Sequence, residues 1–221
     1  MSVASLTDAT PALNSKTDAI VLHLAPHSEK ASLLHLYTRQ HGRTLLLVYG
    51  RHSRKNKGVQ ALLEPLSILH VEAVMHDNGT IGQLRECSLA YVPTRLLFDN
   101  NRRCVALFIA EMLSRTLSHP QQDEMLYDFL VETIRELDTC DDPQNAHIRF
   151  LIHYAAILGF AIDFTDPENQ ALAVLQPLLS QPLSRFPRKA ALHALLDYYS
   201  RHVPDFTMPN SLPVLEAVFN D

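Results

Sequence analysis

The stretch Tyr37–Gly58, YTRQHGRTLLLVYGRHSRKNKG, carries six Lys or Arg residues and no acidic residue. Its centre is the apolar run Leu45–Val48, followed by Tyr49, and this pattern is typical of a strand between cationic turns. Guanidinium and ammonium groups neutralise phosphates, and tyrosine rings accept unpaired bases, so the stretch favours a polyanion with exposed bases as ligand. A basic loop that keeps a strand edge from aggregating has the same composition, and this alternative stays open.

The positive charge of this stretch is local, because the 221-residue chain has a formal net charge of -5. A hydrophobic content of 47% is enough for one or two packed domains. No segment approaches the roughly 18 consecutive apolar residues that span a bilayer, and the first sixteen residues lack the apolar block of a secretory signal. We interpret residues 1–16 as a flexible leader. Three widely spaced cysteines offer no disulfide framework and fit a cytoplasmic protein.

The distributions of charged residues and of glycines along the sequence divide the chain into two modules. Residues 1–80 contain eight Lys or Arg against six Asp or Glu, whereas residues 81–221 contain eleven against eighteen. Five of the six glycines precede residue 83. We therefore predict a turn-rich β domain over residues 17–80, whose last strand extends to about residue 90, and a helical domain over residues 81–221.

The front module shows five short extended segments. Gly42 is expected to supply a positive φ in the hairpin between the second and third, and Arg51–Gly58 to form a cationic loop. Five strands joined by tight turns fit an SH3-like barrel or the five-stranded oligonucleotide-binding (OB) barrel, and the strand count favours the OB type. The predicted strands are Thr17–Ala25, Lys30–Thr38, Arg43–Gly50, Leu62–Met75 and Thr80–Leu89.

The back module changes to helical periodicity. Apolar residues recur at spacings of three and four through most of it, most regularly between Leu126 and Leu137. Gly159 is expected as the residue after a helix C-terminus, and Asp166-Pro167-Glu168 as a helix start. The whole chain therefore predicts an α+β multidomain fold, with an N-terminal five-stranded OB-type β-barrel followed by an all-α domain. The predicted helical segments are 106–117, 126–137, 148–158, a short one after 167, 191–199 and 211–219.

Motifs for nucleotide or metal chemistry are missing from the sequence. There is no GxxxxGK[ST], GxGxxG or HExxH, and the twelve histidines are scattered without ligand spacing. A nucleophile built from Cys87 or Cys104 with a histidine has no spacing in its favour. We therefore expect a protein that is not an enzyme and that has no catalytic residue, cofactor or metal.

Motifs spread along residues 17–221 give the chain a resemblance to a known family. They include Ala19–Leu22, Tyr37-Thr38-Arg39, Val48–Arg51 and, in the back module, Phe98–Leu117. Further matches are Ser53–Lys57, Leu63–Leu66, Leu158-Gly159-Phe160 and Ser211–Phe219. In order and spacing these segments resemble the RecO family of bacterial recombination mediators.

The resemblance implies an OB barrel followed by a helical domain, in a cytoplasmic, nucleoid-associated protein. It implies binding of single- and double-stranded DNA, ATP-independent annealing of complementary strands, and help in loading recombinase onto coated single strands during DNA repair. The implied partners are a RecR-like mediator and the C-terminal tail of single-stranded DNA-binding protein. Many family members also have a four-cysteine zinc site in the helical domain, which this sequence cannot supply.

Two sets of residues follow as candidate sites. The first set is expected to neutralise phosphates or to stack on bases, although both tyrosines could equally face the barrel core. The DNA-binding candidates are Arg39, Arg43, Arg51, Arg54, Lys55, Lys57, Tyr37 and Tyr49. The candidates for cations beside a partner's acidic tail are Arg102, Arg103 and Arg115. The alternative function is a protein-interaction adaptor with a basic barrel loop and no direct role in DNA binding.

Overall fold

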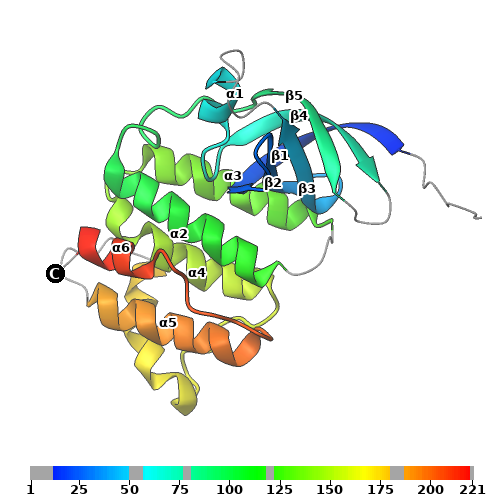
Figure 1. Ribbon diagram of the computed structural model, residues 1–221. Helices are drawn as coiled ribbons and strands as arrows, with labels where there is room; N and C mark the ends of the chain where they lie inside the picture. Colours follow the sequence, from blue (N-terminus) through cyan, green and yellow to red (C-terminus); the bar gives the residue numbers. More distant parts are fainter. Residues whose placement is uncertain (1–11, 50–56, 77–80, 118–121, 180–186, 220–221) are drawn as a thin grey trace, which may run out of the picture. The chain divides into compact units, whose positions relative to one another are not determined.

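The computed structural model describes residues 12–49, 57–76, 81–117, 122–179 and 187–219 (Figure 1). Within these ranges, residues 12–91 with Gln122 and Asp123 form one compact unit, the barrel unit. Residues 92–117 and those from Glu124 onward form a second, the helical unit. β5 thus lies in the barrel unit, whose boundary falls after Tyr91. None of the described helices is long and apolar enough to cross a membrane.

The barrel unit is a closed five-stranded barrel with the strand order β1-β2-β3-β5-β4 (Figure 1). All neighbours are antiparallel except β3 and β5, which pair in parallel through Leu46↔Gly82 and Leu47↔Gln83. This arrangement confirms the predicted OB-type barrel. Its elements are β1 (Ala12–Pro26), β2 (Ala31–Thr38), β3 (Gly42–Tyr49), helix α1 (Lys57–Leu62), β4 (Ile68–His76) and β5 (Gly82–Leu89).

Side chains of alternate residues fill the barrel because successive residues of a strand point to opposite faces. Leu34 and Leu36 of β2 and Leu46 of β3 are completely buried there. Gly82 lets β5 approach β4, since a Cβ at this position would lie 2.4 Å from the Val74 carbonyl oxygen. Gly42 has the predicted positive φ, 61°, at the β2–β3 turn.

Two sequence-based boundaries in this unit were wrong. β1 begins at Ala12 and pairs with β4 from Ala12↔His76 to Ile20↔Ile68, so residues 12–16 belong to the barrel and not to a leader. The predicted strand from Leu62 also starts too early, because α1 ends at Leu62 and β4 begins only at Ile68. In β1, strand pairing across the barrel overrides the local composition.

The helical unit confirms the predicted change of periodicity (Figure 1). Gly159 has φ 89°, and the N–H groups of Gly159 and Phe160 donate to the carbonyls of Ala156 and Ala155, which is a Schellman motif. The segment after Asp166 begins where predicted but forms a 3₁₀ helix. The elements are α2 (Asn100–Thr116), α3 (Glu124–Thr139), η2 (Pro143–Asn145), α4 (Ala146–Ile157), η3 (Pro167–Leu179), α5 (Arg188–His202) and α6 (Leu212–Val218).

Candidate nucleic-acid interface

Three of the predicted DNA-binding residues, Tyr37, Arg43 and Tyr49, lie on the outer side of β2 and β3. We call this side the outer ladder. Leu34, Leu36 and Leu46 point into the barrel, so the residues between them point outward. The cross-strand pairs of the outer ladder are Ala31↔Tyr49, Leu33↔Leu47, His35↔Leu45 and Tyr37↔Arg43. In OB folds the face of strands 2 and 3 is the usual oligonucleotide-binding surface.

Tyr37 is at one end of the outer ladder and is only 1% exposed. Its hydroxyl donates to the backbone carbonyl of Asp123 over 3.4 Å, within the same unit. Burial raises the pKa of Tyr37 to about 12. The structure therefore corrects the candidate role in base stacking, because no face of this ring is accessible.

Tyr49 is at the opposite end of the outer ladder and is 51% exposed. It is the last residue of β3, so the chain runs from it directly into the basic segment. Arg51, Arg54 and Lys55 lie outside the described residues, and Lys57 is the first residue of α1. Tyr49 remains a stacking candidate because about half of the residue is exposed.

Arg39 and Arg43 lie near the β2–β3 turn. The Arg39 N–H donates to the Asp18 carbonyl over 2.9 Å, and burial lowers the pKa of Arg43. Arg43 and Tyr49 are six residue steps apart, which is about 20 Å along β3. The described candidates therefore mark two ends of a strip and do not form one cluster. A strip of this length suits the several nucleotides that an OB fold covers.

Sequence reasoning missed two aromatic side chains in the middle of this strip. The rings of His23 on β1 and His35 on β2 are stacked, with centroids 3.8 Å apart and planes at 21°. Burial lowers the pKa of His35 to about 4, and the charges of His23 and Arg43 act in the same direction. No spacing in the sequence shows that His23 and His35 meet.

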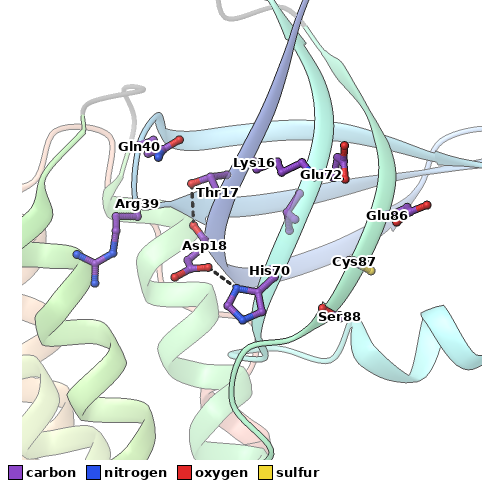
Figure 2. Close-up of a pocket in the computed structure, with 11 residues that line it drawn as sticks. Lys16, Thr17, Asp18, Arg39, Gln40, His70, Glu72, Glu86, Cys87 and Ser88 are labelled. Atoms are coloured by element: carbon purple, nitrogen blue, oxygen red, sulfur yellow. Dashed lines mark hydrogen bonds and ion pairs between the residues drawn. The ribbon is translucent and has the colours of Figure 1, made fainter.

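A shallow hollow of about 470 Å³ lies on the β1, β4 and β5 side of the barrel (Figure 2). Lys16 pairs with Glu72 at 3.1 Å and His70 with Asp18 at 2.6 Å, while Figure 2 shows Arg39 extending away from the latter pair. Three carboxylates against two Lys or Arg residues make this hollow unfavourable for phosphates. The hollow is lined by Lys16, Thr17, Asp18, Arg39, Gln40, His70, Val71, Glu72, Glu86, Cys87 and Ser88.

In the helical unit, helix α2 carries the three cations predicted to contact a partner. Arg102 is 0% exposed. Its guanidinium donates to the backbone carbonyls of Leu137 and Cys140, the latter at 2.6 Å, and pairs with Asp99 at 3.3 Å. Since a fully buried guanidinium cannot meet a partner's acidic tail, the predicted role of Arg102 is wrong.

The other two cations of α2 differ from Arg102. Arg115 pairs with Glu111 at 2.6 Å and also donates to Thr207. Glu111 in turn accepts from the N–H groups of Asn210 and Ser211, so this ion pair holds the start of α6. Arg103 is exposed. Of the three predicted cations, Arg103 alone has an exposed side chain.

A second hollow, of about 600 Å³, lies within the helical unit among α4, α5 and α6. Leu192, Leu215 and Phe219 give it an apolar lining, and the lining also includes Arg188 and Lys189. His147 lines it too, is 2% exposed, and its buried Nδ1 has no hydrogen-bond partner in the described structure. This hollow combines apolar surface with cations, and its lining also includes Glu216, which pairs with Lys189 at 3.2 Å.

The described residues do not form a metal-binding site. These residues contain no group of three or more His, Cys, Asp or Glu that could hold a metal ion. The three cysteines of the chain, Cys87, Cys104 and Cys140, are free thiols and are too few for a four-cysteine zinc site. The residues present therefore do not fit the zinc that some relatives of this fold bind.

Comparison with known proteins agrees with this architecture in both units. A family model described as Recombination protein O N terminal matches residues 13–92, and one described as Recombination protein O C terminal matches residues 97–169. Curated relatives named DNA repair protein RecO come from Phocaeicola vulgatus, at 29% identity, Bacteroides fragilis, at 27%, and Flavobacterium psychrophilum, at 26%. Each alignment covers 93% of this chain and 99% of the relative. The order of the two family matches follows the barrel and the helical unit, and the chain belongs to the RecO family.

Proposed function

We propose that this protein is a recombination mediator that binds single- and double-stranded DNA through the outer ladder of its barrel. Membership of the RecO family supports a role in recombinational DNA repair. The observation that carries the proposal is the strip on the barrel surface, where the half-exposed Tyr49 lies at one end and Arg43 at the other. The basic segment directly follows Tyr49 in the sequence. Cations bind phosphates without reading sequence, as annealing of any two strands requires.

Annealing follows from charge neutralisation on this surface. Two complementary strands that lie on one cationic surface repel each other less than they do in solution, and base pairing then proceeds without a covalent step. The protein is accordingly proposed to act without catalysis, ATP or a cofactor. As a mediator, the protein is further proposed to help recombinase load onto coated single strands.

The test is fluorescence anisotropy of a labelled single strand against salt concentration. The wild type is compared with a variant in which Arg51, Arg54 and Lys55 are changed to Ala. If these residues hold phosphates, the logarithm of affinity falls with the logarithm of salt at about 0.7 per contact, and the variant loses roughly two units of slope. Strand annealing without nucleotide, followed by fluorescence quenching, should slow in the same variant.

The matched control removes three cations from the helical unit, Arg135, Arg149 and Arg201, so that net charge changes equally. Equal salt slopes in the barrel variant and the helical-unit variant would mean that the net charge of the protein, and not the barrel segment, controls DNA binding. Weak binding with an unchanged slope in all three proteins would contradict DNA binding at the barrel. The adaptor function, with a protein bound to the barrel, would then explain the fold better.

The helical unit is proposed to dock the partners, a RecR-like mediator and the acidic tail of single-stranded DNA-binding protein. The hollow beside Leu192 and Leu215 offers an acidic tail an apolar lining and the exposed Lys189, which the tail would take over from its present partner Glu216 at 3.2 Å. In Lys189→Glu, the affinity for a labelled tail peptide, measured by fluorescence anisotropy, should fall at least tenfold. Arg135→Glu, an exposed charge reversal on α3, is the control and should bind the peptide like the wild type. Equal binding by both variants would exclude this hollow.

A further inference from the structure

Two basic side chains of α5 line the hollow among α4, α5 and α6, and a single carboxylate contacts both of them. Lys189 Nζ lies 3.2 Å from Glu216 Oε2, and His193 Nε2 lies 2.6 Å from Glu216 Oε1. Lys189 and His193 are one helical turn apart, so they lie on the same face of α5. Together they form a receptor for a carboxylate, and here the protein itself provides that carboxylate.

The two bases of this receptor are more accessible than the acid that contacts them. The side chain of Lys189 is 70% exposed and that of His193 is 47% exposed, against 19% for Glu216. Hydrogen bonding to His193 lowers the pKa of Glu216, burial acts in the opposite direction, and Lys189 lowers it further. The carboxyl group is therefore ionised at neutral pH, and its negative charge lies at the hollow.

The segment that carries Glu216 has the same chemistry as the proposed ligand. Leu215 and Phe219 lie on either side of Glu216 in the sequence and line the apolar part of the hollow. An acidic group among apolar side chains is what the helical unit is proposed to dock. A second carboxylate that approaches Lys189 is repelled by the charge of Glu216 unless this side chain moves away.

Resting on the docking proposed above, we propose that Glu216 is an internal competitor for the receptor formed by Lys189 and His193, so that an acidic segment of a partner binds by displacing it. Exposed ion pairs are individually weak, so a partner's carboxylates can replace them. The helix does not have to leave, because Glu111 accepts from the N–H groups of Asn210 and Ser211 at the start of α6. Rotation of one side chain is sufficient.

The experiment measures fluorescence anisotropy of the labelled tail peptide with the wild type and with Glu216→Gln. This substitution removes the charge and keeps the size of the side chain, and it should raise the affinity about fivefold. A peptide of the same sequence whose acidic residues are changed to amides should bind both proteins equally. Glu216→Ala, which removes the competing group altogether, should show at least the same gain for the acidic peptide.

The matched control is Glu132→Gln, which removes an exposed carboxylate of α3 that pairs with Arg135 at 3.3 Å. It changes the net charge equally and should bind the acidic peptide like the wild type. In a Lys189→Ala background, Glu216→Gln should give a smaller gain, because one of the two contested bases is absent. The same fivefold gain there would assign the effect to repulsion and overturn the competitor.

Failure of the competitor and failure of the docking site give different results. Equal affinity of the wild type and of Glu216→Gln for the acidic peptide would overturn the competitor and leave the proposed docking intact. If neither protein binds the peptide, the proposed docking in this hollow is itself overturned. Binding by Glu216→Gln but not by the wild type would support the competitor in its strongest form.

Discussion

The outer ladder of the barrel and helix α2 of the helical unit both carry side chains of the kinds that bind ligands, but these side chains differ in their exposure. On the ladder, Tyr49 is 51% exposed, and Arg43 is partly exposed on the barrel surface. On α2, Arg102 is completely buried and Arg115 is held by Glu111, so both stabilise the fold. Cations and aromatic residues thus indicate a binding surface only where their side chains stay accessible.

The largest expected effect concerns Tyr37, which lies on the outer ladder but is buried like Arg102 of α2. Tyr37→Ala should lower the free energy of unfolding by about 4 kcal/mol, because a fully buried aromatic ring is replaced by a cavity. Tyr37→Phe keeps the ring, removes only a 3.4 Å hydrogen bond, and should cost about 1 kcal/mol. Urea denaturation measures both. Similar small losses in the two variants would mean that the ring is not part of the core.

Next in size is the contrast between two neighbouring arginines of α2. Arg102→Ala should destabilise the helical unit by about 3 kcal/mol, because the backbone carbonyls of Leu137 and Cys140 lose their buried donor. Arg103→Ala changes an exposed side chain and should alter stability by less than about 0.5 kcal/mol. Thermal unfolding of both variants checks this. An equal effect of the two substitutions would contradict the buried position of Arg102.

A smaller effect, of about 2 kcal/mol, should appear on acidification. Burial by itself would raise the pKa of Glu111, but hydrogen bonds from Ser211, Arg115 and Asn210 lower it to about 2. Because the folded pKa is below the ordinary value of 4.5, Glu111 stabilises the fold above pH 4.5, and this contribution is lost as the pH falls toward 2. The unfolding free energy of Glu111→Gln should therefore depend less on pH between these values. Parallel pH profiles would show that the carboxylate is not held by these donors.

The smallest expected effect tests whether the ladder is a binding surface at all. Tyr49→Ala should leave the unfolding free energy within about 0.5 kcal/mol and weaken single-strand binding by about 1–2 kcal/mol. Leu47→Ala, on the same face of β3, controls for lost apolar area. Equal losses of affinity in the two variants would assign the effect to strand packing and not to the tyrosine ring.

Much of the fold could be predicted from particular residues. Gly42 marked the β2–β3 hairpin, Gly159 marked the end of α4, and the apolar spacing from Leu126 to Leu137 marked α3. These features depend on backbone conformation and on contacts close in sequence, which composition and period report directly. β1 was predicted too short, since its first residues are held by pairing with β4, which is distant in sequence.

The candidate site was predictable only in part. The basic segment after Tyr49 could be found from composition, because a run of cations without acids is visible in the sequence. The histidine pair could not, since it depends on a single extra residue in β1 and on the register of β1 against β2. Likewise, nothing in the sequence of α2 distinguishes Arg102 from Arg103.

The sequence by itself determined the two modules, the strand and helix periods and the position of the positive charge, because these follow from residue type and spacing along the chain. Only the tertiary structure decided which side chains stay accessible. Tyr37 is outward-facing by period and yet buried, and His23 is inward by period and yet turned outward by a bulge. The physical reason is that alternation fixes the side of a strand to which a residue points, whereas packing and register determine whether solvent or ligand can reach it.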